Sequence, residues 1–192
     1  MANVNLLGPL GPICKMTINV AKYTEEEILE IFKEQHRLCS PHDPEADPMI
    51  EITADMNISE WRQANDLVNW RQLGTFLNKE FRINISEDTW HRTLEPSKSR
   101  KLRQVCQLIS QHADRDTYES KTLLGKRCLE AGVFLTIKRN LSDKGVDVWD
   151  LSPSSLIEDY MNKYFSQILE EATLTGTKMI SEIHIERKKK GF

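Results

Sequence analysis

The sequence of 192 residues predicts a mainly α-helical protein, a small helical bundle with a helical extension on its C-terminal side. Apolar residues recur three and four positions apart in several segments, and these segments begin with capping residues or end near glycine or proline. The charged fraction of 29% and the hydrophobic fraction of 39% are typical of a soluble globular protein. The length is sufficient for one compact domain or two small ones.

The clearest helical pattern covers residues 66–81. Its predicted buried face consists of large apolar residues three or four positions apart: Leu67, Trp70, Leu73, Leu77 and Phe81. Lys79, Glu80 and Arg82 are predicted to lie off this face. The period then changes to alternation through Ile83 and Ile85, which predicts a short extended segment after the helix.

The segment before this helix begins with a helix-capping pattern. Thr24 precedes a predicted helix over residues 25–38, and Glu27 completes a capping box with it. Three prolines and several acidic residues in 40–48 predict an exposed loop, since proline cannot continue a helix. Residues 53–61 are also predicted to be a loop.

After the central helix, residues 87–96 are predicted to form a connector that includes a helical turn. A further helix is predicted over 99–113, with Ser97 or Ser99 as its cap. Four cations gather at its start, where the helix dipole disfavours positive charge, so solvent or an acidic partner must compensate them. These cations are Lys98, Arg100, Lys101 and Arg103.

Two more helices are predicted in the last third of the chain. The first covers residues 131–144 and ends at Gly145. Residues 146–155 are predicted to be a loop, and a longer helix follows over 156–172.

Two alternating segments, 16–20 and 180–185, are candidates for a short two-stranded β pair. The predicted organisation is an N-terminal arm over 1–22, a helical domain over 23–114, and a C-terminal helical region with a basic tail over 115–192.

The order of these signals over residues 24–113 resembles an acyl carrier protein. The matching phrases are TEEEILEIFKEQ, ITADMNISEW, DLVNWRQLGTFLNKEF with RINISEDTW, and KLRQVCQLI. Carrier proteins have an aspartate-serine-leucine triplet at the start of the second helix, and its serine holds phosphopantetheine. The aligned residues here are Asp66, Leu67 and Val68. The resemblance therefore implies a carrier-like fold and a docking surface without the prosthetic arm.

A second, fainter similarity to a carrier lies in residues 133–160. Ser155 and Leu156 there are similar to the missing serine-leucine pair, which makes Ser155 a candidate attachment site. A Ser-Pro-Ser-Ser run before a helix is also typical of a helix cap, and this alternative stays open.

Three residues offer candidate metal ligands. His36, Cys39 and His42 are three positions apart at the end of a predicted helix, and zinc takes such side chains in tetrahedral sites. Pro41 interrupts the helix between the last two, so chance spacing is the competing interpretation. No signature of nucleophilic catalysis or of a phosphate-binding loop is present in the sequence, which favours a protein without an enzymatic activity.

Charge, hydrophobicity and cysteine spacing indicate the cellular compartment and the classes of partner that we expect. The formal net charge of −3 argues against extensive nucleic-acid binding, and no apolar run reaches the length of a membrane span. The first residues lack the basic region of a secretory signal, so we expect a cytoplasmic protein. The basic run 187–190 is expected to be a solvated terminus. Scattered spacing predicts free thiols at Cys14, Cys39, Cys106 and Cys128.

These observations predict a non-catalytic protein-interaction module that needs no cofactor and binds a protein partner. The expected binding surface combines the exposed side of the central helix with the basic start of the helix over 99–113. Its residues are Asn65, Asn69, Arg71, Gln72, Lys98, Arg100, Lys101 and Arg103. The alternatives are a carrier modified at Ser155 and a small metal-binding enzyme that uses His36, Cys39 and His42.

Overall fold

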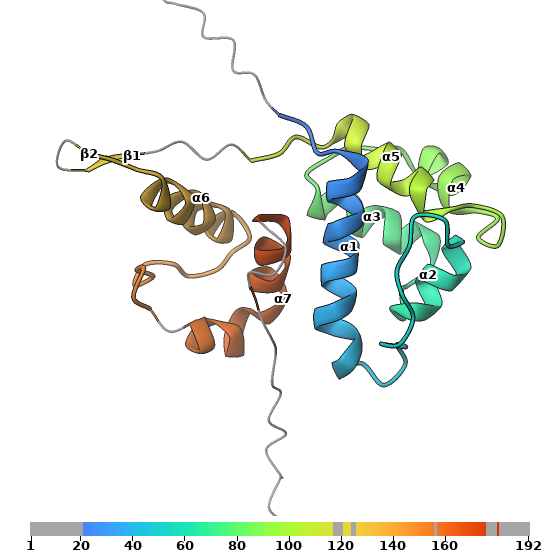
Figure 1. Ribbon diagram of the computed structural model, residues 1–192, viewed down its shortest axis with the longest axis horizontal. Helices are drawn as coiled ribbons and strands as arrows, with labels where there is room; N and C mark the ends of the chain where they lie inside the picture. Colours follow the sequence, from blue (N-terminus) through green and yellow to red (C-terminus); the bar gives the residue numbers. More distant parts are fainter. Residues whose placement is uncertain (1–20, 117–120, 124–125, 156, 176–179, 181–192) are drawn as a thin grey trace, which may run out of the picture.

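The computed structural model describes residues 21–116, 121–123, 126–155, 157–175 and 180. Within these residues the chain is mainly helical, which confirms the predicted fold class (Figure 1). The helices are α1 (Glu25–Cys39), α2 (Ile58–Ala64), α3 (Trp70–Glu80), α4 (Glu87–Leu94), α5 (Leu102–His112), α6 (Leu129–Asp143) and α7 (Ile157–Thr175), with a 3-10 turn at Ser40–His42. Strands β1 (Lys121–Leu123) and β2 (Lys126–Cys128) form an antiparallel hairpin with Lys121 opposite Cys128.

Helix α1 begins at the predicted capping box. The Thr24 hydroxyl accepts a hydrogen bond from the Glu27 amide at 3.2 Å, and the Glu27 carboxylate accepts one from the Thr24 amide at 2.9 Å. These two bonds satisfy amides that have no partner within the helix. The helix then buries Ile28, Ile31 and Phe32 on one side.

The structure differs from three predictions for the middle of the chain: one loop contains a helix, one helix begins later, and one helical turn is longer than predicted. Residues 53–61 are not only a loop, because α2 begins there with Asn57 and Glu60 forming a second capping box. Helix α3 begins at Trp70 rather than near residue 66. Asn69 caps it by accepting hydrogen bonds from the amides of the two residues at positions 71 and 72. Residues 87–96 contain α4, a complete helix rather than a single turn.

Helix α5 also starts later than predicted. Its N-cap is Lys101, and neither Ser97 nor Ser99 caps it. The side chain of Gln104 compensates by accepting a hydrogen bond from the Lys101 amide at 2.9 Å. The predicted termination at Gly145 was correct, since this glycine has a φ of +82° just after α6.

The main core lies among α1 to α5. It includes the predicted Leu73, Leu77 and Phe81 of the central segment, all at most 4% exposed, while Leu67 and Trp70 are partly buried at its edge. Trp90 of α4 is 1% exposed and lies directly on Gly74, where a Cβ atom would be 2.7 Å from the Trp90 ring. Glycine at position 74 therefore permits the close approach of α3 and α4.

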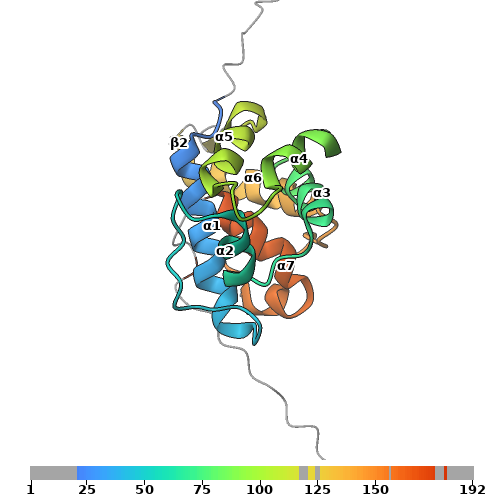
Figure 2. The ribbon, with the colours of Figure 1, turned by 90° about the vertical axis from the view of Figure 1, so that its right-hand side faces the viewer.

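A second, smaller apolar cluster lies between α6 and α7, with Leu141, Val146 and Ile168 as its buried members. Helix α7 packs against α1, and the Tyr23 hydroxyl donates a hydrogen bond to the Leu174 carbonyl at 3.3 Å. Figure 1 shows α7 beside α1, and Figure 2 shows the α6–α7 pair behind the α1–α5 helices. The long helix is kinked at Tyr164, whose φ of −130° and ψ of 37° are not helical.

Some predictions lie outside the described residues. These are the strand candidate 16–20, all of the strand candidate 180–185 except Ile180, most of the arm 1–22, and the basic run 187–190. The division of the chain near residue 114 stays a prediction.

Candidate functional site

The outward side of α3 is the first candidate surface. Residues 73, 74, 77 and 80 of this helix are buried, so the opposite side is presented to solvent. Its exposed residues are Arg71, Gln72, Thr75, Phe76 and Lys79. The predicted surface residues Arg71 and Gln72 therefore belong to one helix face, which we call the α3 face.

Contacts at the start of α3 hold this face in place. Asn69 is exposed, and its amide group donates to the side chain of Gln72 at 2.8 Å while its oxygen caps the helix. The Arg71 guanidinium lies over the Trp70 ring at 4.9 Å and pairs with Glu87 of α4 at 2.9 Å. Both members of this ion pair are more than half exposed, so it orients the arginine more than it stabilises the fold.

The structure adds one residue that sequence reasoning missed. Phe76 on the α3 face is 49% exposed, and Val68 just before the helix is exposed to the same extent. Position 76 lies four residues after Gln72, so the pattern of exposed positions could have indicated it. An exposed aromatic side chain among polar residues is typical of a protein-binding surface.

Asn65 does not belong to the α3 face. It is half-buried, its Oδ1 atom lies 2.9 Å from Nδ1 of His36, and its amide group donates to the Trp61 carbonyl at 2.9 Å. Asn65 thus connects α1 with the end of α2.

The four predicted cations at the start of α5 differ in their availability. Lys98 and Lys101 are exposed, and within the described residues neither forms an ion pair. Arg103 is paired with Asp55 at 3.0 Å, and Arg100 donates to the Glu95 carbonyl at 3.1 Å. Two lysines are therefore available to an acidic partner. No hydrogen bond or ion pair among the described residues joins these four cations to the α3 face.

The candidate metal ligands are not brought together. Among the described residues, no group of three or more His, Cys, Asp or Glu side chains could hold a metal ion, and this includes His36, Cys39 and His42. The first two candidates have different surroundings. The His36 side chain is 6% exposed and contacts Asn65 inside the fold, whereas Cys39 is exposed.

Ser155 lies in the turn before α7 and is half-buried. Its hydroxyl donates to the Asp150 carbonyl at 3.3 Å and accepts from the Ser152 amide at 2.9 Å. These bonds are those of a residue that closes a turn. Both bonds lie within residues 150–155, before α7, so the helix-cap interpretation of the serine run and the attachment of a prosthetic group at Ser155 both stay predictions.

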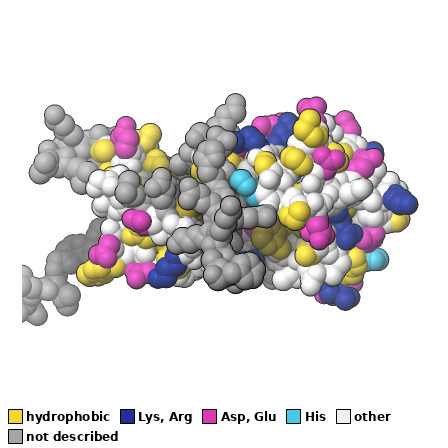
Figure 3. Space-filling view, turned by 90° about the horizontal axis from the view of Figure 1, so that it is seen from below, with side chains coloured by type: hydrophobic (Ala, Val, Ile, Leu, Met, Phe, Trp, Pro, Cys, Tyr) yellow, Lys and Arg dark blue, Asp and Glu magenta, His cyan; other side chains and the backbone are white. Residues whose placement is uncertain are grey.

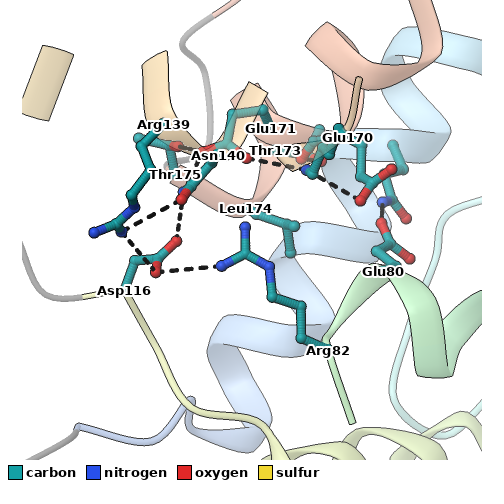
Figure 4. Close-up of polar contacts among 12 residues, drawn as sticks. Glu80, Arg82, Asp116, Arg139, Asn140, Glu170, Glu171, Thr173, Leu174 and Thr175 are labelled. Carbon is teal, nitrogen blue, oxygen red and sulfur yellow. Dashed lines mark hydrogen bonds and ion pairs between the residues drawn. The ribbon is translucent and has the colours of Figure 1, made fainter. Parts of the chain in front are cut away.

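A chain of polar contacts joins the end of α3 to α6 and α7 (Figure 4). Asp116 lies 3.6 Å from Arg82 and accepts a hydrogen bond from the buried Asn140 at 2.7 Å. Asn140 also donates to Glu171 at 2.8 Å. Lys144 then pairs with both Glu171 and Glu170 at 3.0 Å.

Glu80 faces this chain of contacts from α3, and its predicted exposure was wrong. It is 2% exposed, accepts a hydrogen bond from Gln35 of α1, and leaves its Oε2 atom without a hydrogen-bond partner. Burial raises the pKa of Glu80 to about 8, and repulsion from Glu170 adds to the increase, while Gln35 and Lys144 oppose it. The carboxyl group is therefore mostly protonated at neutral pH, because its charged form would be buried at a cost in free energy.

Figure 3 shows basic and acidic side chains interspersed with apolar ones on the visible face of the α1–α5 part. None of the described helices combines the length and the apolar character needed to cross a membrane.

Comparison with known proteins gives no further guidance, because no family model, curated protein or solved structure matches the chain.

Proposed function

We propose that this protein is a non-catalytic interaction module that binds a protein partner through the α3 face. The observation that carries this proposal is Phe76, an aromatic side chain that is 49% exposed at the centre of that face. Aromatic residues surrounded by polar ones supply much of the binding energy of protein interfaces. Asn69 and Gln72 provide hydrogen-bonding groups on the side of α3 toward its N-terminus.

The rigidity of the face supports the same function. Leu73 and Leu77 anchor the inner side of α3 in the core, and Trp90 lies against Gly74. A helix held in this way presents its outer side chains with little loss of conformational freedom on binding. Lys98 and Lys101 are exposed at the start of α5. A partner that reaches this part of the surface would bind better if it carried acidic residues there.

The proposal retains the carrier-like fold without a prosthetic arm. Its support is the order of α1, a long connection, α3, α4 and α5, together with an aligned triplet that contains no hydroxyl group. The triplet Asp66–Val68 precedes the N-cap of α3, and Asp66 has a φ of +46°. Recognition would then depend on the side chains of the module itself.

The test is affinity capture with the full chain as bait, followed by quantitative mass spectrometry of the bound proteins. Phe76→Ser should lower the retention of the specific partner about tenfold or more, the effect typical of a central aromatic contact. Leu135→Ser is the matched control, because Leu135 of α6 is 46% exposed and lies outside the α3 face. Equal retention by both variants would refute the assignment of the α3 face.

The basic residues require a separate test. Lys98→Glu with Lys101→Glu reverses the two available charges and should weaken binding of an acidic partner more at low salt than at high salt. Arg100 and Arg103 are left unchanged, since Arg100 already donates to the Glu95 carbonyl and Arg103 already pairs with Asp55. Binding that is independent of these lysines would restrict the interface to the α3 face.

A further inference from the structure

A pocket lies between α6 and α7, away from the α3 face. Residues of α6 and α7 form its walls, and residues of the loop before α7 and of the first turn of α7 line one side of it, so the pocket is partly open to solvent. The cavity volume is about 190 Å³. Its lining residues are Phe134, Ile137, Leu141, Leu151, Ser155, Tyr160, Ile168, Glu171, Ala172 and Thr175.

The shape of the pocket follows from two features of α7. Ile168, Ala172 and Thr175 are spaced four and three positions apart, so they form one stripe that faces the apolar stripe of α6. Alanine at the middle of this stripe leaves space that a larger side chain would fill. The kink at Tyr164 separates Tyr160, which also lines the pocket, from this stripe.

Three of the polar side chains of the lining, those of Ser155, Glu171 and Thr175, form hydrogen bonds within the protein. Glu171 contributes a carboxylate to the lining of the pocket. Its two oxygens accept hydrogen bonds from Asn140 at 2.8 Å and from Lys144 at 3.0 Å. The hydroxyl of Thr175 donates to the same carboxylate at 3.4 Å. Lys144, which also pairs with Glu170, offsets part of the charge of Glu171, and a ligand in this pocket meets a largely apolar surface.

The volume sets the size of the ligand. Apolar cavities of roughly 150 Å³ stay free of water and bind benzene, whereas pockets for drug-sized molecules begin at roughly 300 Å³. The present cavity of about 190 Å³ lies between these values. It accommodates one aromatic ring with a few additional carbon atoms.

We propose that the α6–α7 pocket is a binding site for a small, uncharged hydrocarbon ligand about the size of one substituted benzene ring. This site is independent of the proposed protein-binding face on α3.

Ligand-observed NMR on the full chain tests the proposal with toluene as the probe. Benzylamine and benzoate, which have the same ring with a positive or a negative charge, are the charge controls. We expect toluene to bind and both charged analogues to bind at least tenfold more weakly, because neither charge finds an unpaired partner in the pocket. Failure of toluene to bind, or equal binding of the three probes, would overturn the proposal.

Variants locate the bound probe. Ala172→Leu fills the middle of the pocket and should reduce toluene binding at least tenfold, whereas Leu135→Ala on the outer side of α6 should leave it unchanged. Ile137→Ala enlarges the cavity and should shift the preference toward butylbenzene, which gives an independent result if Ala172→Leu alters the fold. Unchanged toluene binding by Ala172→Leu with no change of preference in Ile137→Ala would place the ligand elsewhere.

Discussion

Replacement of Glu80 by glutamine should make the protein more stable at alkaline pH. The pKa of Glu80 is about 8 in the folded protein and 4.5 for an ordinary glutamate. Because the folded pKa is the higher one, folding is favoured when the group is protonated, and this contribution is lost as the pH rises from 4.5 through 8. The difference between the two pKa values corresponds to about 5 kcal/mol, which is an upper limit because water penetration and relaxation reduce it.

The Glu80→Gln variant keeps an oxygen that can accept the hydrogen bond from Gln35 and removes the charge that faces Glu170. We expect the free energy of unfolding of the variant to exceed that of the native protein by a few kcal/mol at pH 9 and to approach it near pH 4.5. Urea unfolding at pH 5, 7 and 9 measures both proteins. Glu87→Gln is the matched control, since Glu87 has a side chain that is 61% exposed.

The result that would refute this reasoning is a parallel pH dependence of the native protein and Glu80→Gln between pH 5 and 9. It would mean that Glu80 is ionised in the folded protein and reaches water or a cation. Hydrogen exchange adds a structural readout, because Glu80 faces Glu170 of α7 and Gln35 of α1. Once corrected for intrinsic rates, protection of α7 should fall at pH 9 in the native protein and less so in the variant.

Three further predictions concern other parts of the fold. Gly74→Ala should destabilise the protein by about 1 to 3 kcal/mol in urea unfolding, because its Cβ would be 2.7 Å from the Trp90 ring. Asn69→Ala should cost about 1 kcal/mol in the same assay, because it removes the cap of α3, whereas Asn69→Ser should retain most of that stability. Incubation with a phosphopantetheinyl transferase and coenzyme A should leave the intact mass unchanged; a mass gain of one pantetheine arm that Ser155→Ala abolishes would instead identify a carrier.

The sequence predicts the parts of the fold that local chemistry determines. The capping box at Thr24, the apolar spacing of Leu73 and Leu77, and the glycine after α6 each specify a feature through residues within a few positions. The start of α3 was harder to predict, because the apolar Leu67 continues the helical spacing although the cap is Asn69. Helix α2 was missed because it is only seven residues long.

The candidate site depends more on distant contacts, which the sequence does not reveal. Glu80 follows Leu73 and Leu77 at helical spacing, yet its charge favoured exposure, and it is buried because Gln35 and the distant helix α7 face it. Asn65 likewise leaves the predicted surface because His36 of α1 contacts it. Phe76 is the reverse case, an apolar residue that is exposed. Its exposure follows from the absence of a helix over the outer side of α3 within the described residues.

Site-specific photo-crosslinking tests the assignment of the α3 face most directly. A photoreactive phenylalanine analogue placed at Phe76 in the full chain should form a crosslink with one predominant protein, and the same analogue at Leu135 should not. Crosslinks of equal yield at both positions, or none at position 76 while a partner remains bound to the chain, would contradict the account.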